Sequence, residues 1–338
     1  MKTLRLRLTS PNVAADPALI EAATILRQGG LVAFPTETVY GLGANALSTE
    51  AVEKIFIAKQ RPHWDPVIVH VAEVSEARRL ALAWPEAAER LGAAFWPGPL
   101  TMLVPRAEAI PSICTAGREK VGLRMPSHPV ARALIAAAGV PIAAPSANRF
   151  GHTSPTTAAH VLADLDGRID AILDAGSCDV GVESTVLDPC TEPPVIYRPG
   201  GITPEQIARV LGSVSVAERK ITDEVPPESL ESPGLGIRHY APRARVVLVE
   251  SEAEFHQALA RESAHRVGVL LPDGWADAGQ GVTVVKWGAW SDPESLAREL
   301  YGQLRTLDEL GVEVIVCPVP AAEGIGLAIR DRLRKAAK

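Results

Sequence analysis

The stretch GGLVAFPTETVYGLG, residues 29–43, decides the fold class of the region around it. Residues 31–34 are apolar and typical of a short buried strand, which leads into a loop rich in polar side chains. The loop carries three hydroxyl side chains, the carboxylate of Glu37 and two glycines, whereas an ordinary turn needs only one or two such residues. Because ligands of α/β sheets bind outside the strand ends, we predict a binding surface here.

Further short apolar strands follow within the first 200 residues. They are expected at residues 66–71, 100–105, 121–126, 140–145, 170–176 and 184–188. The helices between them are short, and strands and helices alternate irregularly. This pattern predicts an α/β domain with a mixed sheet.

The last third of the chain has a more regular pattern. Near-continuous apolar strands are expected at residues 245–250, 266–272, 281–287 and 312–320, with helical segments between them. Buried strands that alternate with helices predict a small parallel α/β domain. Residues 213–243 lie between the two patterns, contain four prolines and have little apolar periodicity, so we interpret them as a linker. A length of 338 residues also suggests two domains.

The composition is that of a globular protein, with 47% hydrophobic and 22% charged residues. A formal net charge of −6 does not favour broad electrostatic binding to nucleic acid, although a local basic cleft stays open as an alternative. The four cysteines form no C-x-x-C motif, which argues against a zinc site and fits a reducing cytoplasm. We expect neither a signal peptide nor a membrane span, since no apolar run is long enough.

Lys59 and Arg61 stand at the end of a predicted helix whose apolar stripe includes Val52 and Phe56. Lys59 falls on that stripe and is therefore expected to face the interior. One interpretation is that it only complements the helix dipole. The other is that the two cations bind a polyphosphate, because arginine offers a bidentate fork and lysine a point charge.

Polar side chains recur where the other predicted strands end, and most of them are hydroxyls or cations. The clusters are residues 59–65, 70, 124, 146–154, 184–185 and 198. An ordinary turn would also explain the segment 144–156. The whole set favours an anionic, phosphate-bearing ligand. The chain has no P-loop motif and no G-x-G-x-x-G spacing of a dinucleotide-binding fold. Its sequence also indicates neither a Ser-His-Asp catalytic triad nor a metal-ligand cluster of the usual spacing.

An ordered set of motifs resembles the YrdC-type domain of threonylcarbamoyl-AMP synthases. The motifs are FPTETVYGLG, KQRPHWDPVIVHV, WPGPLTMLV, VGLRMP, APSAN, GHTSPT, ESTVLD and YRPGGIT. SPGLGIRHYAP and the closing VPAAEGIGLAIRDRLRKAA resemble the linker and C-terminal domain of the two-domain form. The resemblance implies a YrdC-like twisted mixed-sheet catalytic domain at 1–212, a linker or lid at 213–243, and a smaller Rossmann-like parallel α/β domain at 244–338.

The family activity implied is that of a nucleotidyltransferase. It condenses L-threonine, bicarbonate or CO2, and ATP to threonylcarbamoyl-AMP and pyrophosphate, with Mg²⁺ accompanying ATP. The product serves the threonylcarbamoyladenosine modification of tRNA, so the implied partners are threonylcarbamoyl transferase proteins in the cytoplasm. Direct tRNA binding is left open. The alternative function is a double-stranded RNA or tRNA-binding module.

The resemblance also implies the site residues. Threonine would be bound by Thr38, His70, Arg124, Ala144 and Ser184. ATP would be bound by Arg61, Asp65, Lys120, Ser146, Ser154, Arg198 and Ile237. Catalysis, mostly positioning and charge neutralisation, would rest on Lys59, Arg61, Ser146 and Asn148, with no protein metal ligand. The chain departs from the usual family pattern with Gln60 for Gly, Asp65 for Asn, Lys120 for Thr and Ile237 for an aromatic residue.

Overall fold

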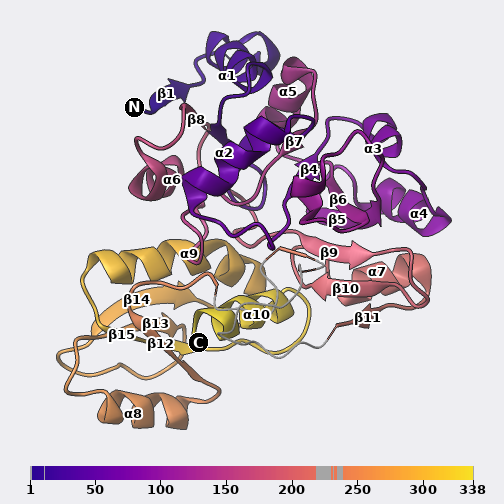
Figure 1. The fold of residues 1–338 in the computed structure, drawn as a ribbon. Helices are drawn as coiled ribbons and strands as arrows, with labels where there is room; N and C mark the ends of the chain where they lie inside the picture. Colours follow the sequence, from indigo (N-terminus) through magenta and orange to yellow (C-terminus); the bar gives the residue numbers. More distant parts are fainter. Residues whose placement is uncertain (1, 11, 218–229, 231, 234–238, 338) are drawn as a thin grey trace.

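The computed structural model describes residues 2–10, 12–217, 230, 232–233 and 239–337. Most of the predicted linker or lid, Ile237 included, lies outside the described residues. Within the described residues the chain forms two sheets, each accompanied by its own helices (Figure 1). The structure thus confirms the predicted fold class, a large mixed sheet followed by a smaller parallel one.

The first sheet has eleven strands in the order β1-β8-β2-β3-β7-β4-β6-β5-β9-β10-β11 and mixes parallel and antiparallel pairs. Its strands are β1 (Leu4–Arg7), β2 (Val32–Phe34), β3 (Gly41–Asn45), β4 (Ile68–His70), β5 (Leu100–Pro105), β6 (Lys120–Arg124), β7 (Ile142–Ala143), β8 (Ala171–Asp174), β9 (Thr185–Asp188), β10 (Val195–Arg198) and β11 (Ser215–Val216). The sheet extends past the boundary predicted at residue 212, because β11 pairs in parallel with β10.

Helices cover both faces of this sheet. They are α1 (Pro17–Arg27), α2 (Thr49–Lys59), α3 (Val74–Leu80), α4 (Glu86–Phe95), α5 (Pro129–Ala138), α6 (Ala158–Leu165) and α7 (Pro204–Leu211), with short 3-10 turns η1 (Val13–Ala15) and η2 (Ser112–Thr115). The sequence sets their starts by capping. Asp16 accepts a hydrogen bond from the Ala18 N–H and precedes Pro17, and Thr203 and Gln206 form a capping box.

The second sheet has the order β12-β15-β13-β14, and all its pairs are parallel. Its elements are β12 (Arg245–Val249), α8 (Glu252–Arg261), β13 (Val267–Pro272), β14 (Thr283–Gly288), α9 (Pro293–Glu309), β15 (Val314–Pro318) and α10 (Gly326–Ala336). None of the helices in the described part of the chain combines the length and the apolar character that a membrane span requires.

The two domains share one apolar cluster. Val39 and Val182 of the first domain pack in the cluster that also holds Leu300 and Leu304 of α9. Figure 1 shows α9 along the boundary between the domains, with α8 on the far side of the second sheet. The second domain is therefore packed directly behind the loop that follows β2.

Of the two glycines at the end of the opening stretch, Gly41 reaches the pocket and Gly43 allows close packing. Gly41 and Gly43 lie on β3, which pairs antiparallel with β2, rather than in the loop. A Cβ atom on Gly43 would lie 2.8 Å from the Phe34 ring and 2.9 Å from Ile142. Close packing explains this glycine, while Gly41 does line the pocket described below.

Candidate active site

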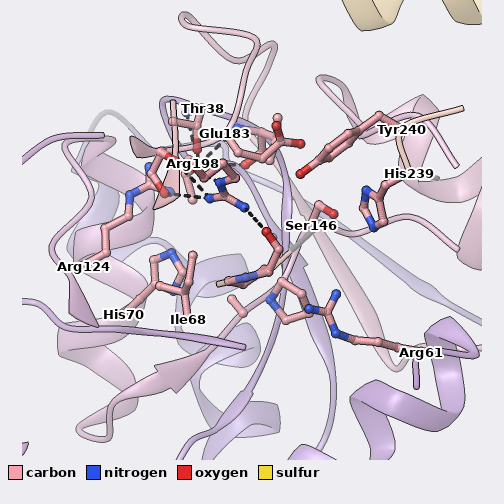
Figure 2. Close-up of a pocket in the computed structure, with 17 residues that line it drawn as sticks. Thr38, Arg61, Ile68, His70, Arg124, Ser146, Glu183, Arg198, His239 and Tyr240 are labelled. Carbon is pink, nitrogen blue, oxygen red and sulfur yellow. Dashed lines mark hydrogen bonds between the residues drawn. The ribbon is translucent and has the colours of Figure 1, made fainter. Parts of the chain in front are cut away.

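A pocket opens where β4 and β6 end. The two strands are parallel, and His70 and Arg124 are register partners at their carboxyl ends. Figure 2 shows both side chains on one side of the pocket, with His239 and Tyr240 on the other. The loop between β2 and β3 and the segment after β7 complete this end of the pocket.

The structure brings together all five residues predicted to bind threonine. Thr38, His70, Arg124, Ala144 and Ser184 line the pocket, although they come from five separate segments of the chain. The Thr38 hydroxyl lies 2.8 Å from that of Thr36, and the Ser184 hydroxyl lies 2.8 Å from that of Thr101. Their individual roles stay predictions.

Arg124 and His70 are both buried, and their polar atoms are incompletely satisfied. Arg124 forms an ion pair with Glu37, with 2.8 Å between Nη2 and Oε1. Within the described residues, neither Arg124 Nε nor His70 Nδ1 has a hydrogen-bond partner. Burial, reinforced by the charge of Arg124, lowers the pKa of His70 to about 3. His70 is therefore a neutral imidazole at pH 7.

Of the residues predicted to bind ATP, Arg61, Ser146 and Arg198 line the pocket. The Arg61 side chain is buried and pairs with Asp65, with 3.0 Å between Nη2 and Oδ2. It also donates to the carbonyl oxygen of Asp65. Arg198 donates to the Ser184 carbonyl oxygen from Nε and Nη2. These two arginines place positive charge at the pocket.

The other predicted ATP ligands lie elsewhere. Ser154 is buried beside the pocket, where its hydroxyl donates to Glu183. Lys120 begins β6, at the opposite end of the strand from Arg124, and forms an ion pair with Asp188 at 2.5 Å. It borders a separate small cavity beneath Ile68 and Pro233. Ile237 lies outside the described residues.

Lys59 and Asn148 support the segment after β7. The Lys59 ammonium donates to the carbonyl oxygens of Ser146 and Asn148, at 2.6 and 2.5 Å. The Asn148 amide donates to the carbonyls of Arg149 and His152. Burial first, and then the neighbouring Arg61, hold the pKa of Lys59 well below its ordinary value. In this structure Lys59 contacts the backbone that carries Ser146 rather than the pocket itself.

Comparison with known proteins agrees with this geometry. A family model described as "Telomere recombination" matches residues 24–200, and one described as "Threonylcarbamoyl-AMP synthase, C-terminal domain" matches residues 202–338. The threonylcarbamoyl-AMP synthase of Bacillus subtilis is 46% identical, covering 100% of this chain and 98% of the relative. That of Pyrococcus abyssi is 44% identical, covering 93% and 92%. The chain belongs to the threonylcarbamoyl-AMP synthase family.

A solved structure supports the same assignment. The crystal structure of P. abyssi Sua5 complexed with L-threonine has a TM-score of 0.89 and 40% identity, and the match covers 100% of this chain and 98% of that chain. The match to this threonylcarbamoyl-AMP synthase structure therefore includes both domains of the present chain. The resemblance inferred from its motifs is confirmed over the full length.

The synthase pocket also contains residues that the sequence analysis did not select. Among the described residues, Glu183 is the one acidic side chain that lines the pocket, and the hydroxyl of Thr36 and the rings of His239 and Tyr240 line it too. The sequence interpretation stressed the hydroxyls of the segment ESTVLD and passed over the acid that begins it. Its position directly before Ser184 was the available signal.

The Mg²⁺ expected with ATP stays a prediction. In the described ranges no group of three or more His, Cys, Asp or Glu side chains is placed to hold a metal. Glu37, Asp65 and Glu183, which lie at or beside the pocket, each pair with an arginine. We therefore assign none of them to the ion. A magnesium ion held by substrate phosphates and water needs few protein ligands.

Proposed function

We propose that this chain condenses L-threonine, bicarbonate or CO2, and ATP to threonylcarbamoyl-AMP and pyrophosphate. One observation carries the proposal: two adjacent buried side chains at the pocket, Arg124 and His70, each keep a polar nitrogen without a partner in the described residues. A buried donor without an acceptor is costly unless a ligand supplies one. A bound amino-acid carboxylate would satisfy Arg124.

The remaining charges suit the second substrate. Arg61 and Arg198 line the same pocket, so a triphosphate would meet two cations there, while the acid of the described lining, Glu183, is paired with Arg332. Arginine binds phosphate oxygens with charge-assisted hydrogen bonds. Because both arginines are already held by protein carbonyl oxygens, little reorganisation is needed when charge develops.

The chemistry then proceeds in two steps. The deprotonated amine of threonine forms a bond to the carbon of CO2 and, after losing a proton, becomes a carbamate. A carbamate oxygen next bonds to the α-phosphorus of ATP, and the bond from that phosphorus to the bridging oxygen breaks to release pyrophosphate. The chain's contribution is to hold the two substrates in contact and to neutralise charge. Neutral His70 adds a hydrogen-bonding group without adding charge.

A reconstitution with purified components tests this function. The protein is incubated with L-threonine, bicarbonate, Mg²⁺ and ATP, and threonylcarbamoyl-AMP and pyrophosphate are sought by mass spectrometry. We expect product that disappears when threonine or bicarbonate is omitted, and loss of product in Arg61→Ala and Arg124→Ala. A folded wild-type protein that binds ATP but makes no product contradicts the proposal, and a gel shift with double-stranded RNA would then examine the binding-module alternative.

The product is an activated carbamoyl group, so a second protein must consume it. We infer a cytoplasmic transferase that moves the threonylcarbamoyl group to tRNA. The four free cysteines are compatible with that compartment.

A further inference from the structure

The acid in the pocket is held by the other domain. Glu183 lies between β8 and β9 of the first domain, and Arg332 on α10 donates from Nε to its Oε2 at 2.6 Å. Tyr301 on α9 donates its hydroxyl to the same carboxylate, 3.0 Å from Oε2. Both side chains are fully buried, with Arg332 1% and Tyr301 0% exposed. The second domain therefore supplies two of the carboxylate's partners.

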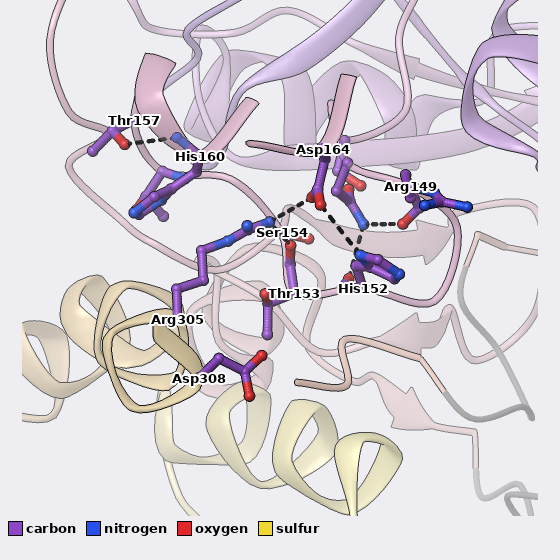
Figure 3. A network of polar contacts seen from close by, with 12 residues as sticks. Arg149, His152, Thr153, Ser154, Thr157, His160, Asp164, Arg305 and Asp308 are labelled. Carbon is purple, nitrogen blue, oxygen red and sulfur yellow. Dashed lines mark hydrogen bonds and ion pairs between the residues drawn. The ribbon is translucent and has the colours of Figure 1, made fainter. Parts of the chain in front are cut away.

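The third partner is a predicted nucleotide ligand. Ser154 donates its hydroxyl to Glu183 Oε1, so the carboxylate joins α9 and α10 to the segment 153–154. One turn further along α9, Arg305 reaches the same segment from outside (Figure 3). Arg305 donates to the Thr153 carbonyl oxygen and forms an ion pair with Asp164 at 2.8 Å. Helix α9 thus reaches Thr153 directly through Arg305, and Ser154 through Tyr301 and the Glu183 carboxylate.

Helix α9 packs closely against the segment 179–183 of the first domain. A Cβ atom on Gly181 would lie 2.3 Å from the Cα of Arg298 and 2.5 Å from the carbonyl oxygen of Ala297. The Arg298 guanidinium donates to the Asp179 carbonyl oxygen at 2.7 Å. Segment 179–183 is therefore pressed against the backbone of the helix that carries Tyr301.

The charge arrangement explains why the pocket needs this support. Glu183 is at the same pocket as Arg61 and Arg198, which are expected to meet the triphosphate. Burial alone would raise the pKa of Glu183, but the charges of Arg332 and Arg198 outweigh burial and hold it below its ordinary value. The carboxylate is thus ionised. Without Arg332 its charge would repel phosphate and compete for Arg198.

Arg332 reaches a second side of the pocket. Its guanidinium carbon lies 5.1 Å from the centre of the Tyr240 ring, a cation–π distance, and Tyr240 lines the pocket. Its Nη1 pairs with Asp331. One buried arginine therefore contacts both the acid of the first domain and the aromatic residue that faces it.

We propose that Arg332 and Tyr301 are positioning residues for ATP, which act by neutralising and fixing Glu183 so that Arg198 stays available to the nucleotide. This inference rests on the proposed function, because it assumes that ATP occupies the pocket. It gives the second domain a direct part in substrate binding. It also predicts that removing the acid compensates for removing the arginine.

Full-length variants test the proposal. We expect Arg332→Gln to raise the KM for ATP roughly tenfold or more, because it leaves a buried carboxylate without its main partner. The KM for threonine should change less, since Arg124 and His70 lie across the pocket from Tyr240, the ring that Arg332 contacts. Adding Glu183→Gln to Arg332→Gln should restore most of the ATP affinity. Tyr301→Phe keeps the packing and removes one hydrogen bond to Glu183, so it should raise the KM for ATP roughly a few-fold.

Arg330→Gln is the matched control. Arg330 lies on the same helix, but it pairs with Glu250 and the Pro320 carbonyl oxygen inside the second domain. We expect its ATP dependence to match the wild type. Binding of α,β-methylene-ATP, measured by calorimetry, supplies a readout independent of turnover, and thermal unfolding shows that each variant is folded.

The outcomes separate the two proposals. Wild-type protein that makes no product contradicts the proposed function. Active wild type with an Arg332→Gln/Glu183→Gln variant no better than Arg332→Gln alone overturns this inference, as does an unchanged ATP affinity in folded Arg332→Gln and Tyr301→Phe. If Arg332→Gln proves unstable, Tyr301→Phe alone decides, because it removes only a hydroxyl.

Discussion

His70 and Arg124 are direct register partners at the ends of the parallel strands β4 and β6. The pairing fixes a neutral ring beside a guanidinium, and both belong to rigid strands rather than loops. Strand-borne groups hold their positions more precisely than loop-borne ones, which suits a site that works by positioning.

Arg124→Lys should weaken threonine binding. Lysine keeps a positive charge beside Glu37 but loses the planar fork that matches a carboxylate. We expect the KM for threonine to rise about 10- to 100-fold, and the KM for ATP to stay within about threefold. Initial rates at varied threonine and varied ATP measure both. Arg132→Lys, an exposed change on α5, is the control. An unaltered KM for threonine would remove Arg124 from the threonine site.

His70 should make the protein sensitive to acid. Its native pKa is about 3, against 6.5 for an ordinary histidine. Below pH 6.5 the histidine therefore binds a proton in the unfolded chain but not in the native state. The free energy of unfolding falls as the pH decreases towards 3. Relative to His70→Asn, the wild type should lose about 1.4 kcal/mol more per pH unit in that window.

Urea unfolding at pH 7 and pH 5 measures this difference. His265→Asn, at an exposed histidine, is the control for loss of an imidazole. Parallel pH dependences for the wild type and His70→Asn would show that His70 takes up its proton in the native state.

Lys59→Met should destabilise the segment after β7. The substitution keeps the length of the side chain but leaves the carbonyl oxygens of Ser146 and Asn148 without their donor. We expect a loss of about 2–4 kcal/mol in the free energy of unfolding, together with a lower kcat. Lys54→Met on the same helix loses one hydrogen bond and an exposed ion pair with Glu50, and should cost less than about 1 kcal/mol. Equal urea midpoints for the two variants would contradict this role.

Asp65→Asn should lower the free energy of unfolding and raise the affinity for ATP. Asp65 and Arg61 form a buried pair, so loss of the charge should lower the free energy of unfolding by about 1–3 kcal/mol. Arg61 stays in place because it also donates to the carbonyl oxygens of Asp65 and Pro66. With its charge no longer compensated, we expect a several-fold lower KM for ATP.

Steady-state kinetics and urea unfolding on the same preparation test both halves. Glu53→Gln, at an exposed pair with His63, is the control and should change neither quantity. A higher KM for ATP in Asp65→Asn would mean that the carboxylate assists nucleotide binding.

The sequence predicted the fold where periodicity acts locally. The parallel second sheet followed from four apolar runs. Gly43 was misinterpreted because its constraint is the ring of Phe34 across the strand pair, a contact that spacing along the chain does not reveal. The end of the first sheet was missed because β11 has only two residues and depends on its pairing with β10.

The candidate site was predictable only where motifs carried it. The five predicted threonine ligands all reach one pocket, but nothing in their spacing indicated that His70 and Arg124 would be register partners. Glu183 was overlooked because an unpaired acid next to phosphates is unfavourable, and its partner Arg332 lies 149 positions away in the sequence. Interactions between domains of this kind have no local signature.

The shared apolar cluster limits how this enzyme can be shortened. A chain cut after residue 212 would expose Val39 and Val182, which now pack against α9. A minimal single-domain catalyst built from this sequence would therefore need a redesigned surface at both positions and a neutral residue in place of Glu183. The sequence pattern divides the chain into two domains, but a shortened catalyst would have to replace the contacts that the second domain makes.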